Sequence, residues 1–385
     1  MRIVVSGYYG FGNAGDEAVL QGLLASLREA AGDEALHVTV LSGDPAATAA
    51  QHGVEAVPRQ HAGAVRGALR RADLLISGGG GLLQDRTSAR SPLYYLGVIA
   101  MARALRVPVY LYGQGVGPIR RPWLQRVAAM CLKSVAGAGV RDEASARRLL
   151  ELGVPRERIA VTADAAFALA PPGAAAREAA RNRLGPADRR LIGVVWRSPW
   201  VEEGIGESGR HTVRRGVAEA VARFAQAHGG SVVVFPFHPE MDEEDAVRFA
   251  GEVAAEGADA VRWPGDAAMS FAGEPAAPAG PWMTLLAAVD VALCVRFHGL
   301  VFAAMAGVPA VALAYDPKVR HLAEDLGVPW FAPGAGPEAI REALEQVWAE
   351  REAVSRKLSA RAAELRTRAR AEGKRAIELA RKARC

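Results

Sequence analysis

The sequence predicts an α/β protein made of two consecutive Rossmann-like domains, each built on a parallel sheet. Its 385 residues are too many for one ordinary domain and suit two. Short β-rich runs alternate with Ala/Leu/Arg-rich helical segments, and this alternation is typical of parallel sheets. The alternation stops in a segment rich in Ala, Pro and Arg and then begins again, so the chain repeats one kind of domain.

In the first half, we expect buried strands at Arg2–Ser6, Leu36–Leu41, Leu74–Ser77, Val107–Tyr112 and Gly137–Val140. Helical patterns lie between them, such as Glu17–Ala31 and Glu143–Leu152. The segment Pro171–Asp188 has no strand pattern, which indicates a linker and a helix.

In the second half, we expect strands at Leu191–Trp196, Ser231–Pro236, Val291–Val295 and Ala310–Ala314, with one more at Asp259–Pro264. From Pro337 onward the pattern is helical, and one face carries apolar residues at spacings of 4 and 7. Two Rossmann-like halves and a long C-terminal helix form the GT-B architecture, whose ligands lie beyond the carboxyl ends of the strands. The expected domains are residues 1–170, a linker and helix at 171–189, residues 190–335, and a basic helical tail at 336–385.

The net charge of +5 is unevenly distributed. Residues 351–385 hold twelve Lys/Arg and four Glu, a net of +8, so the rest of the chain is slightly acidic. Such a basic block binds nucleic acid or an anionic membrane, or is the solvated face of a docked helix. We expect no nucleic acid here, and a membrane surface or a docked helix stay as the alternatives.

Composition and the chain ends predict a cytoplasmic protein. The three cysteines form no CxxC pair and indicate neither a disulfide framework nor a zinc site. The N-terminal apolar run ends within a few residues, unlike a signal peptide. The longest apolar stretch, Gly299–Tyr315, is interrupted by Gly307 and Pro309 and is shorter than the ~20 residues of a membrane helix. At most, the protein binds at the inner face of a membrane.

Glycine-rich motifs in the first half indicate a site for a neutral sugar. GYYGFGNAGDE begins at Gly7, GGGGLLQD at Gly78 and YGQGVGP at Tyr112, each after an expected strand. Asp16 and Glu17 would repel a phosphate, whereas Asn13 and Asp16 could hydrogen-bond hydroxyls, with Asp16 as a general base. The alternative is that these side chains only cap helices. The predicted acceptor-binding residues are Gly12, Asn13, Gly15, Asp16, Gly80, Gln84, Asp85 and Gln114.

Cationic motifs indicate an anion site. Arg296 and His298 alternate in CVRFHG within an apolar stretch, where burying either without a partner would be costly. On an extended segment they would point the same way, and Gly299 would then begin a helix whose N-terminus favours anions. Arg141 in VRDE, His238 in PFHPEMD and Lys318 in YDPK also stand at expected strand ends. Each also has a simpler interpretation: Arg141 in a surface ion pair, His238 at the edge of the core, and Lys318 as an ordinary exposed lysine.

The sequence has no HExxH, no Walker loop, no DxD motif and no nucleophile elbow. We therefore expect chemistry on an anionic donor with no metal and no cofactor.

These motifs, in this order, resemble those of the polysaccharide pyruvyl transferase family, CsaB type, from Met1 to about Trp330. The resemblance implies a GT-B-like fold, phosphoenolpyruvate as donor substrate, and a ketal that joins pyruvate to two hydroxyls of one sugar. It also implies a lipid-linked acceptor that contains N-acetylmannosamine, in a wall polymer that anchors S-layer proteins. By motif, Arg141, Arg296, His298 and Lys318 carry over as donor-site residues.

Together the residues and the resemblance predict that cations from both halves meet in an interdomain groove and hold the donor. His298, Arg141 and Asp16 are the expected catalytic residues, and Arg296, His298, Lys318, Arg141, Gly299 and His238 are expected to bind the donor. Two alternatives remain: a GT-B glycosyltransferase or epimerase that uses a nucleotide sugar, and a non-catalytic sugar-binding protein.

Overall fold

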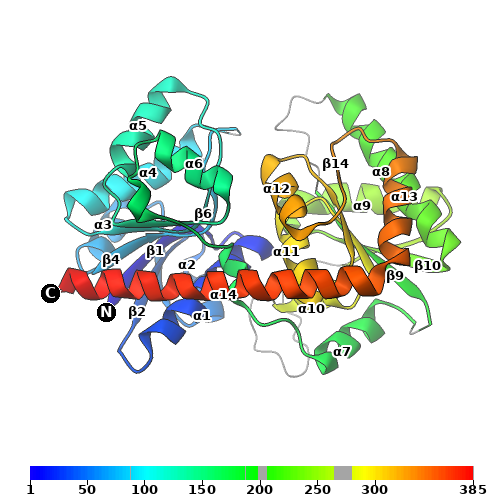
Figure 1. Cartoon of the computed structure of the whole chain (residues 1–385), viewed down its shortest axis with the longest axis horizontal. Helices are drawn as coiled ribbons and strands as arrows, with labels where there is room; N and C mark the ends of the chain where they lie inside the picture. Colours follow the sequence, from blue (N-terminus) through cyan, green and yellow to red (C-terminus); the bar gives the residue numbers. More distant parts are fainter. Residues whose placement is uncertain (87, 187, 198–205, 264–279, 385) are drawn as a thin grey trace. The chain divides into compact units, whose positions relative to one another are not determined.

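The computed structural model describes residues 1–86, 88–186, 188–197, 206–263 and 280–384. The chain divides into two compact units (Figure 1). Unit 1 is Met1–Leu169 with Glu364–Cys385, and unit 2 is Ala170–Ala363. Ala187 in the expected linker, Pro264 at the end of an expected strand and Cys385 in the tail lie outside the described residues.

Unit 1 has a parallel sheet with the strand order β3-β2-β1-β4-β6-β7-β8, and β5 also pairs with β6. Its strands are β1 (Arg2–Tyr9), β2 (His37–Ser42), β3 (Glu55–Pro58), β4 (Leu74–Ser77), β5 (Gly80–Leu83), β6 (Val109–Val116), β7 (Gly137–Val140) and β8 (Ile159–Val161). The helices that alternate with them are α1 (Ala14–Ala31), α2 (Pro45–His52), α3 (Ala62–Leu69), α4 (Arg90–Ala104), α5 (Pro122–Leu132) and α6 (Glu143–Glu151).

Unit 2 has a second parallel sheet with the order β11-β10-β9-β12-β13-β14. Its strands are β9 (Arg190–Val195), β10 (Gly230–Phe235), β11 (Asp259–Arg262), β12 (Val291–Cys294), β13 (Ala310–Leu313) and β14 (Trp330–Phe331). Its helices are α7 (Ala174–Leu184), α8 (Glu207–Ala227), α9 (Pro239–Ala255), α10 (Gly280–Ala287), α11 (Phe297–Ala306), α12 (Pro317–Leu326) and α13 (Pro337–Ala349). The order of the strands reverses at β9, which places the carboxyl ends of β10, β9, β12 and β13 side by side.

Two glycine motifs that were predicted to follow strands lie partly within them. β1 continues to Tyr9 and β6 to Val116, because neighbouring strands still pair with them there. Both strands change register on the way, between Ser6 and Tyr9 and between Leu111 and Gln114. Gly113 stands in the second irregularity with φ +55°, a conformation that favours glycine.

The C-terminal helix α14 (Arg351–Arg384) begins in unit 2 and ends in unit 1 (Figure 1, red). Its apolar face is buried, with Leu358, Leu365 and Ile377 each at most 4% exposed. Glu372, between these positions, is fully buried and accepts hydrogen bonds from the Gly113 amide and the Thr162 hydroxyl at 2.8 and 2.9 Å. In the described part of the chain, no helix combines the length and hydropathy that crossing a membrane requires.

Candidate functional site

In unit 2, Arg296 follows β12 and occupies the N-cap position of α11. Its Nε and Nη2 donate to the two carboxylate oxygens of Asp242 at 2.6 and 2.5 Å. The Asp242 side chain is 1% exposed and that of Arg296 11%, so the pair is shielded from water. This bidentate geometry uses two of the five guanidinium donors and fixes the plane of the others.

His238 stands beside this pair, at the N-terminus of α9 and the carboxyl end of β10. Its amide donates to Asp242 Oδ2 at 3.0 Å, so one carboxylate holds both Arg296 and the backbone of His238. The His238 side chain is almost completely buried, and neither ring nitrogen has a hydrogen-bond partner among the described residues. Burial and the nearby Arg296 charge lower the pKa of His238, which favours the neutral ring. A buried polar group without a partner is a place where a ligand can supply the missing hydrogen bond.

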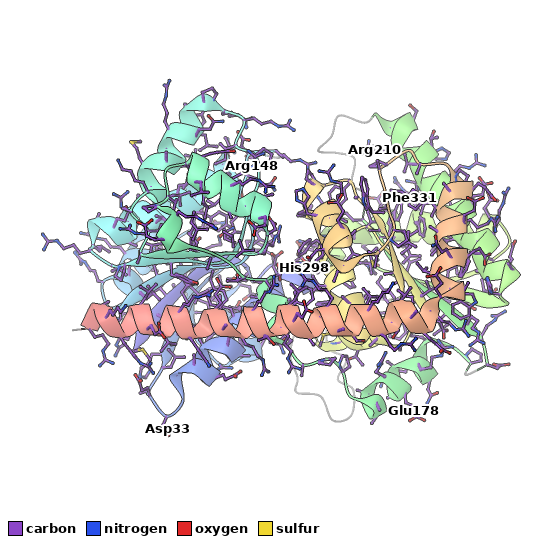
Figure 2. The ribbon with its side chains drawn as sticks, in the orientation of Figure 1. Asp33, Arg148, Glu178, Arg210, His298 and Phe331 are labelled. Carbon is purple, nitrogen blue, oxygen red and sulfur yellow. The ribbon has the colours of Figure 1, made fainter. Side chains whose placement is uncertain are left out.

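His298 lies in the first turn of α11, not on an extended segment (Figure 2). The expected alternation of Arg296 and His298 along one strand face is therefore wrong, because the helix already begins at Phe297. The His298 ring lies edge-on to Phe297, with centroids 5.2 Å apart. A Cβ at Gly299 would come within 3.0 Å of Val195, so this glycine lets α11 pack closely on β9. Gly299 thus also has a packing role, apart from any role at a helix start.

Two further cations lie at the same edge of the sheet. Lys318 is in the first turn of α12, and its Nζ is 3.7 Å from the Asp316 carboxylate, which also caps the helix. Arg197, two residues past β9, donates to the Tyr315 hydroxyl at 2.7 Å, and its guanidinium lies over the Tyr315 ring. Sequence reasoning missed Arg197, although an arginine directly after a buried strand was the signal that identified Arg141.

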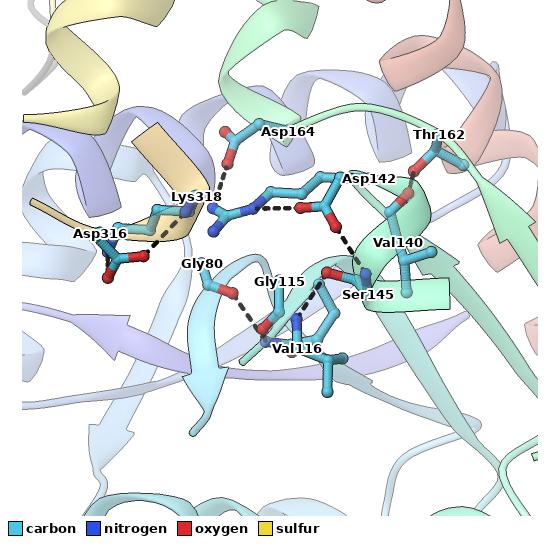
Figure 3. Close-up of polar contacts among 12 residues, drawn as sticks. Gly80, Gly115, Val116, Val140, Asp142, Ser145, Thr162, Asp164, Asp316 and Lys318 are labelled. Atoms are coloured by element: carbon cyan, nitrogen blue, oxygen red, sulfur yellow. Dashed lines mark hydrogen bonds and ion pairs between the residues drawn. The ribbon is translucent and has the colours of Figure 1, made fainter. Parts of the chain in front are cut away.

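In unit 1, Arg141 follows β7 and is buried between the carboxylates of Asp142 and Asp164, both labelled in Figure 3. It lies 3.3 Å from Asp164 and 3.6 Å from Asp142, and only 6% of its side chain is exposed. A Cβ at Gly115 would come within 2.5 Å of the guanidinium, so this glycine of β6 makes room for it. Arg141 is thus a shielded cation at a strand end and not half of a surface ion pair.

Asp16 lies in the first turn of α1, directly after the glycine-rich loop. Asn13 caps the helix by accepting from the Gly15 amide at 3.0 Å. Glu17 accepts from the Gly10 amide and pairs with the buried His52, both at 2.9 Å. Asp16 is half-buried, and a Cβ at Gly80 would lie 3.4 Å from its Oδ1. Asp16 therefore reaches the second glycine motif, whereas Asn13 and Glu17 hold the loop.

Three other predicted acceptor residues are engaged within the fold. Asp85 is buried and accepts from the amides of Arg120 and Arg121 at 2.7 and 3.0 Å. Although burial works to raise its pKa, these amides hold the pKa of Asp85 below its usual value. Gln114 is fully buried in β6 and donates to the Gly80 carbonyl at 2.8 Å (Figure 3). Gln84 is partly buried, and its Cβ would lie 2.7 Å from a Cβ at Gly117, so the two motifs pack together.

A cluster that sequence reasoning missed surrounds Arg59, one residue past β3. The Arg59 guanidinium lies 4.2 Å from the ring centroid of Tyr94, 5.3 Å from that of Tyr95 and 5.4 Å from that of Phe11. It donates to the Gly7 carbonyl and the Tyr95 hydroxyl at 3.2 and 3.3 Å. Tyr8 stacks on Phe11 with centroids 4.3 Å apart. The GYYGF motif and the Tyr94-Tyr95 pair are visible in the sequence, but nothing there links them to Arg59.

The predicted cations thus fall into two groups, Arg141 in unit 1 and Arg296 and Lys318 in unit 2, and each has a carboxylate partner. Their convergence on one ligand stays a prediction. Within the described ranges, no group of three or more His, Cys, Asp or Glu side chains is placed to hold a metal ion.

Comparison with known families gives one match, in which the family model described as polysaccharide pyruvyl transferase covers residues 13–317. No curated protein matches the chain. Among solved structures, Alr3699/HepE from Anabaena in complex with UDP is similar, with a TM-score of 0.61, 15% identity and 98% of each chain covered. A putative UDP-N-acetylglucosamine 2-epimerase from Listeria monocytogenes has a TM-score of 0.62 at 12% identity, covering 93% of this chain and 90% of that one. A glycosyltransferase from Rickettsia africae has a TM-score of 0.61 at 10% identity, covering 99% and 98%. At such identities the likeness shows the fold, and the predicted GT-B architecture is confirmed.

Proposed function

The chain belongs to the polysaccharide pyruvyl transferase family, enzymes that transfer pyruvyl groups, and from this we propose its donor and acceptor. The donor is phosphoenolpyruvate, and the acceptor is a lipid-linked cell-wall saccharide that contains N-acetylmannosamine. The product is a pyruvate ketal on two hydroxyls of one sugar, with release of phosphate. The resulting polymer would anchor S-layer proteins.

The observation that carries the proposed donor is the set of polar groups at the carboxyl edge of the unit 2 sheet. Arg296, Lys318, His238 and His298 all come from the ends of adjacent strands or the helix turns that follow them. The N-terminus of α11, whose first turn has no acidic residue, adds amide groups that favour an anion. Phosphoenolpyruvate has a carboxylate and a phosphate, so it can engage several such donors at once.

Asp242 changes how Arg296 would act. Because the carboxylate neutralises the guanidinium, Arg296 supplies oriented N–H donors more than net positive charge. Lys318 and Arg197 are themselves partly exposed, and they would supply the charge that the donor needs. The neutral ring of His238 would meet the donor with a hydrogen bond in place of its missing partner.

In the proposed reaction, His298 stabilises the phosphate or delivers a proton to the methylene carbon, which leaves C2 cation-like. A sugar hydroxyl attacks C2 while Asp16 or a nearby base takes its proton. The second hydroxyl of the sugar then displaces phosphate, closes the ketal and loses its own proton. Of the two protons that the sugar hydroxyls lose, one balances the proton added to the methylene carbon. The other leaves with the phosphate. Donors already in place around C2 and the phosphate would be the main catalytic contribution.

The deciding experiment is to titrate the protein with phosphoenolpyruvate and with UDP-N-acetylglucosamine by calorimetry. We expect phosphoenolpyruvate to bind, and His298→Ala and Arg296→Lys to weaken that binding or abolish turnover. Incubation with phosphoenolpyruvate and a synthetic N-acetylmannosamine-containing lipid disaccharide should then add the mass of a pyruvate ketal. If the protein binds UDP-N-acetylglucosamine but does not bind phosphoenolpyruvate, the result would favour a glycosyltransferase or epimerase and overturn the proposal.

Arg141 belongs to the other unit, and its assignment to the same donor is part of this proposal. Arg141→Lys keeps the charge and loses the fork of donors that binds a carboxylate or phosphate bidentately. The proposal expects a higher KM for phosphoenolpyruvate in this variant. An unchanged KM would remove Arg141 from the donor site.

A further inference from the structure

The Arg59 cluster, made of Tyr8, Phe11, Arg59, Tyr94 and Tyr95, lies where the parallel sheet of unit 1 offers a ligand site. Its residues come from the carboxyl ends of β1 and β3 and from the first turns of α4. The Arg59 amide donates to the Ser42 carbonyl at the end of β2, at 2.9 Å. The cluster therefore gathers the ends of three adjacent strands, the edge at which ligands of such sheets bind.

Arg59 differs from the predicted cations in its partners. Arg141, Arg296 and Lys318 each face a carboxylate, whereas among the described residues Arg59 has only neutral partners: the Gly7 carbonyl, the Tyr95 hydroxyl and aromatic faces. Two of its five N–H donors are used, which leaves three for another acceptor. A half-buried guanidinium without a counter-charge has its strongest missing interaction with an anion.

The surroundings hold the guanidinium in place. Tyr94 lies under it and donates its hydroxyl to the Arg59 carbonyl at 3.1 Å, so this residue fixes both backbone and side chain. Phe11 stands on the loop between two glycines of positive φ, Gly10 and Gly12, and its ring packs where a Cβ at Gly43 would be. Tyr8, Phe11 and Tyr94 are each partly exposed residues. Exposed aromatic faces suit the apolar C–H face of a sugar ring.

We propose that the Arg59 cluster is a saccharide subsite that selects a sugar with an anionic group, a carboxylate or a phosphate. The sugar packs on the exposed aromatic rings, and the remaining N–H donors of Arg59 bind the anion bidentately. Asp16 is in the first turn of α1, four residues after Gly12, which would bring a base near the same sugar. This inference rests on the proposed function in taking the bound saccharide as the acceptor.

The test is an NMR titration that measures how tightly the full chain binds three matched monosaccharides. Glucose, glucuronate and glucose 1-phosphate share one ring and differ in their charge. We expect at least one anionic sugar to bind about tenfold or more tightly than glucose, the gain typical of a charged hydrogen bond. Glucuronate and glucose 1-phosphate distinguish a carboxylate from a phosphate, and inorganic phosphate alone should bind more weakly than the anionic sugar.

Arg59→Gln should remove the preference for the anionic sugar. Phe11→Ala should lower the affinity for all three sugars by the same factor. The matched control is Arg71→Gln, which removes an exposed arginine 3.8 Å from Glu55 in the same part of unit 1 and should change nothing. If Arg59→Gln does not fold, the salt dependence of the wild type replaces it: the preference should shrink as salt rises, because the anion contact is electrostatic.

Equal affinity for all three sugars, no detectable binding of either anionic sugar, or a preference that survives in Arg59→Gln would overturn the inference. Failure of the proposed function has a different outcome: the wild-type protein would not bind phosphoenolpyruvate but would still prefer the anionic sugar. Conversely, Arg296→Lys should weaken the binding of phosphoenolpyruvate and leave the preference for the anionic sugar unchanged.

Discussion

Asp242 shows how one buried carboxylate can hold two of the candidate site residues in place. It holds the guanidinium of Arg296 with two short hydrogen bonds and the amide of His238 with a third. Asp242 lies four residues after the N-cap residue His238, so its bond to the His238 amide is at the N-terminal end of α9. Losing this carboxylate would leave a largely buried cation without a partner.

We therefore predict that Asp242→Asn lowers the free energy of unfolding by about 1–3 kcal/mol and raises the KM for phosphoenolpyruvate more than it lowers kcat. Thermal unfolding and steady-state kinetics measure the two effects. Glu244→Gln is the control, because that residue is on the same helix in an exposed pair with Arg248. A purely structural Asp242 would lower stability and leave KM unchanged.

Gly115 has a comparable role for Arg141. The guanidinium occupies the space that a side chain at residue 115 would need, and Asp142 and Asp164 keep it there.

Gly115→Ala should displace Arg141 and weaken phosphoenolpyruvate binding, with a cost of about 1–3 kcal/mol in stability from overpacking. Calorimetric titration and chemical unfolding check both. Gly81→Ala serves as the control, since its Cβ would meet no other atom within 4 Å. Normal donor binding by Gly115→Ala would show that the position of Arg141 is not required.

At the scale of elements, the sequence predicted the fully buried strands well. β4 and β7 begin and end at the expected residues, because continuous apolar runs between helical patterns have few other interpretations. It missed β3, β8 and β14, which have two to four residues and are only partly buried, so their composition carries little signal. β5 was missed because the four glycines from Gly78 to Gly81 indicated a turn, whereas β5 begins at Gly80 and pairs with β6.

The predicted site residues divide in the same way. Strand-end cations such as Arg296 were found because a charge in an apolar stretch is conspicuous. The carboxylate that holds it, Asp242, comes from the start of helix α9, and the sequence has no local sign of that contact. The cluster of Arg59 and its aromatic partners could not be predicted for the same reason, because only the order of the strands in the sheet brings these residues together.

Glu372 makes α14 sensitive to pH. Burial raises its pKa to about 8, although the Gly113 amide and the Thr162 hydroxyl favour the ionised form. Between the ordinary pKa of a glutamate and about 8, the unfolded chain is ionised at this residue while the folded chain keeps the proton. The folded state thus binds more protons in this window, and its stability falls as the pH rises through it.

We predict that the free energy of unfolding of unit 1 decreases from pH 5 to pH 8, by up to roughly 1.4 kcal/mol per pH unit. Glu372→Gln should flatten this slope, because an amide has no proton to lose and can still accept from Gly113. Denaturant unfolding at several pH values measures it. Glu378→Gln, an exposed glutamate of α14, should keep the wild-type slope, and an equally steep slope in Glu372→Gln would contradict the assignment.

At the scale of the whole molecule, the charge separation between tail and body has a structural counterpart in α14. Arg361, Arg370, Arg381 and Arg384 pair with Asp325, Glu29, Glu34 and Asp73, so part of the excess positive charge is balanced by acids of the two units. The apolar face of the same helix is buried. These contacts support the alternative of a docked helix, and they leave a smaller set of basic residues for any other partner.

That smaller set still suits the proposed anionic membrane surface. Lys357, Arg368, Arg375 and Lys382 are exposed and follow one another at spacings of 11 and 7, which places them along one face of α14. Changing all four to Gln should abolish cosedimentation with vesicles that contain phosphatidylserine. Changing Arg370 and Arg381 to Gln, which removes arginines already paired with acids, should have a much smaller effect. Binding of the wild type should weaken as salt rises, because the attraction is screened. If the wild type fails to bind such vesicles even at low salt, or if the fourfold variant binds as well as the wild type, α14 does not hold this enzyme at a membrane.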